Sequence, residues 1–423
     1  MSGFKLSTGA DLDTVFQPRT ATDPSAQYIA YTTSNGKSLS ERYLPYTTGT
    51  KVANTLYKVT DASGVVRDLS DYYSRVLTLG WSALSGGLNS VVYTISAVKG
   101  TSNVYVGGKF TTAGGRNANN IARWDGTNWN AMETGVNERV YAIYALDTSN
   151  VYVGGEFTTA GGASANYIAK WNGSSWSALG SPTNGVSSWV RAIYALDTSN
   201  VYVGGDFATA GGASANYIAK WNGSSWSALG AGLNDRVRAI YAVDASNVYV
   251  GGSFSMAGGT NGRNYIAKWN GINSSWSALT SGLSFQVYCI YAVNASNVYV
   301  GGLFNNAGGT PANRLAKWNG INSSWVALGS PTNGANSEVY AIYALDANNV
   351  YLGGAFNGAG SVSANYIARW DGSSWSVLGS PTNGVNSTVW AIFALDSNNI
   401  YVGGDFTQAG GVNASNIAKW GYS

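Results

Sequence analysis

Residues 140–180 read VYAIYALDTSNVYVGGEFTTAGGASANYIAKWNGSSWSALG, and this stretch decides the fold. Its opening segment is rich in β-branched and aromatic residues, which favour strands. We expect strands at residues 140–146, 151–155, 167–171 and 174–180. Polar or Gly-rich residues separate them, and Asn172-Gly173 predicts a primed hairpin turn between the last two. The stretch therefore predicts four consecutive antiparallel strands.

The same stretch recurs along the whole second part of the chain. Each copy contains the motif Val/Ile-Tyr-Val/Leu-Gly-Gly, and successive copies are 47 to 52 residues apart. The motif begins at Val104, Val151, Val201, Val248, Val298, Val350 and Ile400. This period suits one four-stranded blade of a β-propeller. No segment has a helical period, so the sequence predicts an all-β, seven-bladed ring.

Tryptophan pairs predict how the ring closes. Each complete copy has one Trp on the third strand and one on the fourth: Trp124/Trp129, Trp171/Trp176, Trp221/Trp226, Trp269/Trp276, Trp318/Trp325 and Trp370/Trp375. The last copy ends with Trp420 on its third strand, and the repeats begin with a lone fourth strand containing Trp81. We predict that this strand completes the last blade and so removes the open edges of the ring. Because the pairs recur in every copy, packing between blades explains them better than sugar stacking.

The closure also sets the domain boundary. We expect an attachment or assembly module at residues 1–78 and the propeller at residues 79–423. The first part has a weak internal echo, with FKL…ADLDTVF in residues 4–16 and YKV…RDLSDYY in residues 57–73. It is too short and polar for a large core, so a small docking module or an arm ordered by a partner fits better.

Composition excludes several functions. The net charge is only +3 and is spread along the chain, which gives no support for nucleic-acid binding. His is absent, which excludes His metal ligands, Ser-His-Asp triads and His general bases. The single Cys, Cys289, cannot form an intrachain disulfide, and we expect it to be a small buried residue. Turn aspartates such as Asp147 are expected to cap their own turns rather than bind calcium. We expect neither a cofactor nor a metal.

Hydropathy bears on location. The N-terminus lacks a basic-then-apolar signal pattern, and no apolar run reaches the roughly 18 residues of a membrane helix. We therefore expect a soluble chain without membrane insertion, and an extracellular role would not depend on a conventional signal peptide.

Differences between the copies gather at two places. One is the junction from the fourth strand to the next first strand, and the other is the residue after Gly-Gly. In a four-stranded meander both connections lie on the same face, which we call the variable face. Its aromatic and guanidinium groups are our candidate ligand-binding residues: Trp189, Arg191, Arg236, Arg238, Phe285 and Trp390. These residue types are enriched at binding hot spots, and neutral drift in exposed loops is the alternative.

The repeat VYVGGxFTTAGGxxANYIAKWNGSSWSALG resembles the Gly-Gly-x-Phe propeller repeats of the delta-60 type and of Rax2-like cell-surface proteins. The resemblance covers about four-fifths of the chain. It implies a propeller used for surface display or scaffolding, with no catalytic residues to carry over. The two N-terminal segments resemble short Asp-Leu motifs near the start of structural proteins of large DNA viruses and phages. That resemblance implies a displayed domain after them, although the second copy ends in Tyr-Tyr.

Three functions compete. The first is a non-enzymatic display protein of a virion or extracellular surface assembly. In it, residues 1–78 dock on other structural proteins and the propeller face binds a surface glycan or protein. The second is a free propeller lectin or protein-interaction scaffold, which would also suit the cytoplasm. The third is an enzyme, which we do not expect because the acids of the variable face (Glu138, Asp235 and Glu338) stand in separate blades. The ligand and the oligomeric state stay open, and a homo-oligomer is one of the alternatives.

Overall fold

The computed structural model describes residues 5–6, 58–60, 66–68, 79–180, 184–329, 334–379 and 383–422. The chain divides into two units, and the larger spans Gly80–Gly421. Strands β1 (Lys5–Leu6), β2 (Lys58–Thr60) and β3 (Val66–Asp68) form a separate antiparallel sheet in the order β1-β2-β3. The first echoed segment thus pairs with the second, since Leu6 lies opposite Val59. The remainder of both Asp-Leu segments, and most of the predicted attachment module, lies outside the described residues.

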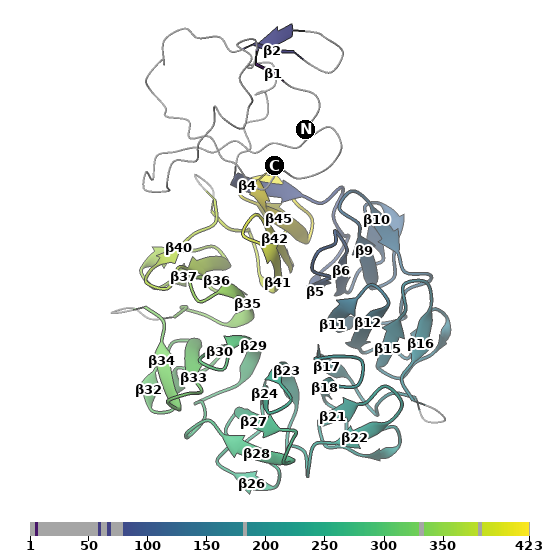
Figure 1. Cartoon of the computed structure of the whole chain (residues 1–423), viewed down its shortest axis with the longest axis vertical. Helices are drawn as coiled ribbons and strands as arrows, with labels where there is room; N and C mark the ends of the chain where they lie inside the picture. The colour runs from purple at the N-terminus through teal and green to yellow at the C-terminus, as the bar shows by residue number, and fades with distance from the viewer. Residues whose placement is uncertain are drawn as a thin grey trace. The chain divides into compact units, whose positions relative to one another are not determined.

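The larger unit is a ring of seven four-stranded antiparallel sheets (Figure 1). Blade I contains β5 (Val92–Ala97), β6 (Val104–Gly108), β9 (Ile121–Trp124) and β10 (Trp129–Ala131). Blade II contains β11 (Val140–Asp147), β12 (Asn150–Gly155), β15 (Ile168–Trp171) and β16 (Trp176–Ala178). Blade III contains β17 (Val190–Ala195), β18 (Val201–Gly205), β21 (Ile218–Trp221) and β22 (Trp226–Ala228). Blade IV contains β23 (Val237–Asp244), β24 (Asn247–Gly252), β27 (Ile266–Asn270) and β28 (Ser275–Ala278).

The remaining blades follow the same order. Blade V contains β29 (Val287–Asn294), β30 (Asn297–Gly302), β33 (Leu315–Asn319) and β34 (Ser324–Ala327). Blade VI contains β35 (Val339–Asp346), β36 (Asn349–Gly354), β39 (Ile367–Trp370) and β40 (Trp375–Ser376). Blade VII contains β41 (Val389–Asp396), β42 (Asn399–Gly404), β45 (Ile417–Tyr422) and β4 (Leu79–Ala83). The predicted all-β, seven-bladed fold is confirmed.

Two local features differ from the expected repeat. The Gly-rich connection between the second and third strands contains a small hairpin, such as β13 (Thr159–Ala160) with β14 (Ala163–Ser164). Its counterparts are β7 (Thr112–Ala113) with β8 (Arg116–Asn117), β19 (Thr209–Ala210) with β20 (Ala213–Ser214), β25 (Met256–Ala257) with β26 (Thr260–Asn261), β31 (Asn306–Ala307) with β32 (Thr310–Pro311), β37 (Gly358–Ala359) with β38 (Val362–Ser363), and β43 (Gln408–Ala409) with β44 (Val412–Asn413).

The other difference is the turn after the third strand, where the predicted primed turn at Asn172-Gly173 is wrong. Trp171 pairs directly with Trp176, so the loop has four residues. The Asn172 side-chain oxygen accepts hydrogen bonds from the backbone N–H groups of Ser174 and Ser175, at 2.9 and 2.8 Å. Only Gly173 takes a positive φ, of 100°. An Asn-capped turn therefore replaces the expected one.

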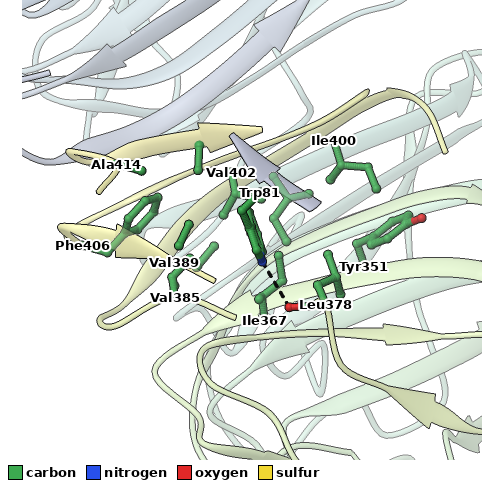
Figure 2. Packing of buried hydrophobic residues seen from close by; sticks show 14 of the residues in the cluster. Trp81, Tyr351, Ile367, Leu378, Val385, Val389, Ile400, Val402, Phe406 and Ala414 are labelled. Atoms are coloured by element: carbon green, nitrogen blue, oxygen red, sulfur yellow. Dashed lines mark hydrogen bonds between the residues drawn. The ribbon is translucent and has the colours of Figure 1, made fainter. Parts of the chain in front are cut away.

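The ring closes as predicted from Trp81. Strand β4 is the outer strand of the last blade, and the sheet order is β4-β45-β42-β41. The Trp81 and Trp420 rings lie 5.4 Å apart between centroids. Figure 2 shows Trp81 inserted among buried residues of the last two blades, with its indole N–H donating to the Leu378 carbonyl at 3.1 Å. One residue thus joins the start of the ring to its end.

The other fourth-strand tryptophans confirm the packing interpretation. Their indole N–H groups donate to a backbone carbonyl of the preceding blade, with Trp375 as the exception. Trp129, for example, donates to the Leu84 carbonyl at 3.0 Å, and Trp276 donates to the Leu229 carbonyl at 2.9 Å. These tryptophans fasten neighbouring blades together.

The two glycines of the Gly-Gly pair let the next blade and the preceding junction lie close to the second strand, and this positions the variable face. A Cβ on Gly204 would lie 2.3 Å from Cγ1 of Val237 in the next blade. A Cβ on Gly205 would lie 2.0 Å from the Trp189 carbonyl oxygen in the junction before β17. Any larger residue would push the neighbouring blade or the junction away. The pair therefore fixes where each junction lies.

Candidate binding surface around the ring axis

Backbone pairing brings the two variable positions of each blade together. The N–H of Asp206, which follows Gly-Gly, donates to the Trp189 carbonyl at 2.9 Å. The same bond links Ser253 to Arg236 at 3.0 Å, and each of the other blades has its equivalent. Both variable positions therefore lie on one face, as the meander topology predicts.

The first strands are the innermost strands of the blades and surround the ring axis (Figure 1). The second residue of each first strand lies next to the junction. We call these seven residues the axial ring: Tyr93, Tyr141, Arg191, Arg238, Tyr288, Tyr340 and Trp390. Six of the seven neighbouring pairs make an aromatic or cation–π contact, with ring centres 4.2 to 6.1 Å from the next ring or guanidinium carbon. The axial ring is therefore a nearly continuous belt of π-systems.

One sector of the axial ring is charged. The Arg191 guanidinium binds Asp206 through two hydrogen bonds of 2.8 and 2.7 Å. Its carbon lies 5.2 Å from the centre of the Trp189 ring and 5.4 Å from that of Tyr141. The hydroxyl of Tyr141 donates to Glu156 at 2.6 Å. Arg191 is thus held in a fixed orientation and already has its carboxylate partner.

Arg238 occupies the same position in the next blade but lacks that partner. Ser253 stands where Asp206 stands one blade earlier, and the Arg238 Nε lies 3.4 Å from its hydroxyl oxygen. The Arg238 guanidinium also stacks on Tyr288 at 5.2 Å. Among the residues that the structure describes, no carboxylate forms an ion pair with Arg238.

Arg236 lies in the junction before Arg238 and has only long ionic contacts. Its Nε is 3.9 Å from Asp206 and 3.7 Å from Asp235, and 42% of the side chain is exposed. Asp206 is therefore a mostly buried carboxylate that interacts with three guanidinium groups, those of Arg191, Arg236 and Arg238.

The pKa values reflect this imbalance. Burial and the neighbouring Arg191 guanidinium lower the pKa of Arg238. Burial also acts to lower the pKa of Arg191, but its hydrogen bonds and charge attraction to Asp206 outweigh burial and raise it. The protein thus stabilises the charge of Arg191, whereas Tyr288 and Asp206 offset only part of the unfavourable effects on the charge of Arg238.

The opposite sector of the axial ring is aromatic. Tyr340 and Trp390 stack at 4.2 Å with an angle of 22° between their planes. Tyr288 adjoins Tyr340 at 5.3 Å, and Tyr93 adjoins Trp390 at 6.1 Å. Burial raises the pKa of Tyr340 to about 12, so its hydroxyl stays protonated at neutral pH. This sector presents neutral hydroxyls and ring faces beside the unpaired Arg238.

The six predicted residues divide into two groups. Arg191, Arg238 and Trp390 belong to the axial ring, whereas Trp189, Arg236 and Phe285 lie in the junctions. Trp189 is 39% exposed and Phe285 is 42% exposed. The prediction omitted the four tyrosines of the axial ring, and it omitted Asp206 and Ser253. The four tyrosines occupy the same repeat position as Arg191, Arg238 and Trp390, so aligning the copies by position would have found them. Asp206 and Ser253 occupy the other variable position, the residue after Gly-Gly.

A second aromatic belt lies deeper along the first strands. Tyr144, Tyr194, Tyr241, Tyr291 and Tyr343 follow one another with centroids 4.6 to 4.9 Å apart, and Phe393 continues the series. Neighbouring hydroxyls are hydrogen-bonded, and burial raises the pKa of these tyrosines. We call this belt the tyrosine girdle.

Two other residues named from the sequence have defined contacts. Asp147 accepts hydrogen bonds from the Ser149 N–H and the Asn150 side chain, which confirms its capping role. Cys289 is partly buried, and its thiol lies 3.6 Å from the Val339 carbonyl. Within the described residues, no group of three Cys, Asp or Glu side chains could hold a metal ion. The described part of the chain also contains no helix long and apolar enough to span a membrane.

Comparisons with known proteins agree with this architecture. The family model of the Rax2 C-terminal beta propeller domain matches residues 74–236 and 222–392. The WD40 beta-propeller domain of Doa1 superposes with a TM-score of 0.52 at 15% identity, covering 82% of this chain and 97% of that one. The extracellular domain of a putative hybrid two-component system from B. thetaiotaomicron gives a TM-score of 0.54 at 14% identity, covering 82% of this chain. This chain spans only 40% of that domain, and both likenesses show the fold alone. No curated protein sequence matches the chain.

Proposed function

Because the chain belongs to the Rax2 C-terminal beta-propeller family, we propose that it is a non-enzymatic display protein whose variable face binds a surface glycan or protein. A propeller of this kind fits a protein-interaction scaffold. In our proposal, residues 1–78 anchor the chain to other structural proteins of a virion or an extracellular surface assembly.

The axial ring is the observation that carries the proposal. Seven equivalent positions on one face hold five aromatic residues and two arginines in nearly continuous contact. Trp189 and Phe285 add exposed aromatic surface beside it. Partly exposed aromatic and guanidinium groups are the usual anchors of binding surfaces.

Binding rather than catalysis also suits the acids of this face. Asp235 accepts a hydrogen bond from the N–H of Arg236 at 2.6 Å, and Glu338 accepts one from the Ser337 hydroxyl. Each therefore has a local structural partner, and they belong to different blades. The runner-up function is a free lectin or interaction scaffold with the same binding face and no anchored assembly.

A glycan and protein array probed with the full chain tests the binding face. Trp189→Ala and Trp390→Ala should abolish or strongly weaken the signal, since each removes a ring from this face. Ile321→Ala is the matched control, because Ile321 is 81% exposed in the hairpin between β33 and β34, at the opposite end of the strands. Equal loss with all three variants, or a flat array, would refute ligand binding by the variable face.

Immuno-electron microscopy of the native source, with antibodies to the propeller, tests the anchoring role. We expect label on a particle or surface assembly for the full chain and none for a chain that begins at residue 79. Retention of the shortened chain on the assembly would favour the free scaffold instead.

A further inference from the structure

We propose that Arg238 and Arg236 bind the carboxylate of an acidic sugar residue, and that the aromatic sector of the axial ring receives the apolar face of the same sugar. This inference rests on the proposed binding role of the variable face. It narrows the ligand to a carboxylate-bearing glycan.

Comparison of two neighbouring blades identifies the site. In blade III, Arg191 is bound by Asp206, the residue after Gly-Gly. In blade IV, Arg238 has the same backbone position, but Ser253 replaces the carboxylate. Arg238 therefore lacks a carboxylate partner at a position where the equivalent arginine of blade III binds one.

The net charge of the nearby side chains indicates how many negative charges the ligand carries. Arg191, Arg236 and Arg238 bring three positive charges, whereas Asp206 and Asp235 bring two negative charges. Glu156, which also acts on Arg191, is balanced by its ion pair with Arg139. The excess of one positive charge calls for a single carboxylate. A polyphosphate or a strongly acidic peptide would bring several charges to a site that can neutralise one.

The Arg238 guanidinium is available in a fixed orientation. It is held on the Tyr288 ring at 5.2 Å, and its one polar contact to a side chain within the described residues is the 3.4 Å contact with Ser253. A guanidinium fork can bind a carboxylate through two parallel hydrogen bonds, and holding it in place lowers the entropy lost on binding. Arg236, which is 42% exposed, can turn toward the same anion.

The aromatic sector favours a sugar over other organic acids. Tyr288, Tyr340 and Trp390 follow Arg238 in order around the axis, with no charged residue between them in the axial ring. The negative face of an aromatic ring attracts the C–H groups of a sugar ring, and the phenol hydroxyls can bond to its hydroxyl groups. A sugar acid matches both the single charge and the adjoining ring faces.

Isothermal titration of the full chain with defined oligosaccharides tests the ligand class. The probes are 3′-sialyllactose, a hyaluronan tetrasaccharide and neutral lactose, so that sialic and uronic acids are separate arms. We expect at least one acidic probe to bind about tenfold or more tightly than lactose, because hydrogen bonds to charged groups are strong. Its affinity should fall as salt is added.

Substitution of Ser253 tests the site without removing an arginine. Ser253→Asp restores the pairing of blade III, so it should occupy Arg238 and weaken the acidic probe about tenfold or more. Ser253→Asn is the neutral control of similar size and should retain binding. Arg238→Gln should also lose the acidic probe, whereas Arg116→Gln, an exposed arginine in β8, should not.

The melting temperature of the free protein supplies a readout that needs no ligand. Ser253→Asp should raise it relative to Ser253→Asn, because only the carboxylate neutralises Arg238.

The outcomes separate this inference from the proposed function. If lactose and the acidic probes bind equally, and Trp390→Ala abolishes both, the face binds glycans but the carboxylate site is wrong. Unchanged acidic binding in Ser253→Asp overturns the inference in the same way. If neither acidic probe binds, the inference fails, and the array with the Trp189 and Trp390 variants decides the proposed function separately.

Discussion

Substitution of Trp81 by Ala tests whether one strand closes the ring. Trp81 is the only buried residue of β4, and the next buried side chain is Leu84. Its indole N–H reaches the Leu378 carbonyl at 3.1 Å, and its ring packs on Trp420 at 5.4 Å. The substitution therefore removes most of the apolar contact that holds β4 in the last blade.

The expected magnitude follows from large-to-small core substitutions. Replacing a buried Trp by Ala costs about 3–5 kcal/mol. Since each 1.4 kcal/mol is a tenfold change in an equilibrium constant, the detached population of β4 should rise by roughly two to four orders of magnitude. Detachment is a local opening, because β4 reaches blade VII from the other end of the sequence.

Trp276→Ala is the matched control. Trp276 has the same exposure as Trp81, 8%, and its indole N–H donates to the Leu229 carbonyl at 2.9 Å. It pairs with Trp269 at 5.2 Å, but its strand follows its blade directly in sequence. Both variants should lose similar global stability in urea denaturation, whereas only Trp81→Ala should add a local opening.

Hydrogen exchange and limited proteolysis distinguish these outcomes. In Trp81→Ala, amides of β4 and β45 should exchange much faster, and a new cleavage should appear near residues 84–91. In Trp276→Ala, the amides of β4 should keep their protection. The reasoning is refuted if the two variants give the same exchange pattern in β4, because closure would then not depend on Trp81.

Three further predictions follow from particular contacts. Gly204→Ala should destabilise the propeller by about 1–3 kcal/mol in urea denaturation, because its Cβ would lie 2.3 Å from Cγ1 of Val237; an unchanged midpoint would contradict the close-approach argument. Burial raises the pKa of Tyr343 to about 12, so its contribution to stability should be complete below pH 10 and should be lost as pH rises through 12. That loss approaches about 2.7 kcal/mol, and Tyr343→Phe should show a smaller fall between pH 10 and 12 than the parent chain. Burial raises the pKa of the Cys289 thiol, so Ellman's reagent at pH 8 should label it only after unfolding, and rapid labelling of the native protein would contradict this.

The sequence was sufficient for the ring and its closure because both depend on periodic features. Seven copies of one motif give the blade number, and the unmatched Trp81 and Trp420 can only pair with each other. The turn at Asn172 could not be predicted in the same way. The Asn side chain competes for backbone N–H groups at 2.9 and 2.8 Å, which a dipeptide preference does not take into account.

The candidate site was predictable as a face but not as a set of contacts. Arg191 and Asp206 are 15 residues apart, and Arg191 lies at a register shift between Val190 and Ala192 in β17. Such an irregularity is invisible in the repeat pattern. The contrast between Arg191 and Arg238 therefore becomes apparent only when the partner after Gly-Gly is seen beside each arginine.

Residues that differ between near-identical blades differ for structural or for functional reasons. The two are distinguished by whether the changed side chain satisfies a neighbouring hydrogen-bonding group. Blade I has Thr94 and Ser96 where blade II has Ala142 and Tyr144, which interrupts the tyrosine girdle. Both hydroxyls accept backbone N–H groups of β11, at 3.2 Å from Ile143 and 3.0 Å from Ala145.

This variation is therefore explained by the joint between blades I and II, and no ligand is needed to account for it. Ser253 also departs from its counterpart in blade III, but its change leaves the Arg238 guanidinium without a carboxylate, rather than satisfying a neighbouring group. A half-buried charge without a carboxylate partner costs stability. Each of the other six blades has a residue other than Ser at the position of Ser253. That cost, at a position where the fold accepts Asp one blade earlier, is the physical reason to look for the missing anion at blade IV.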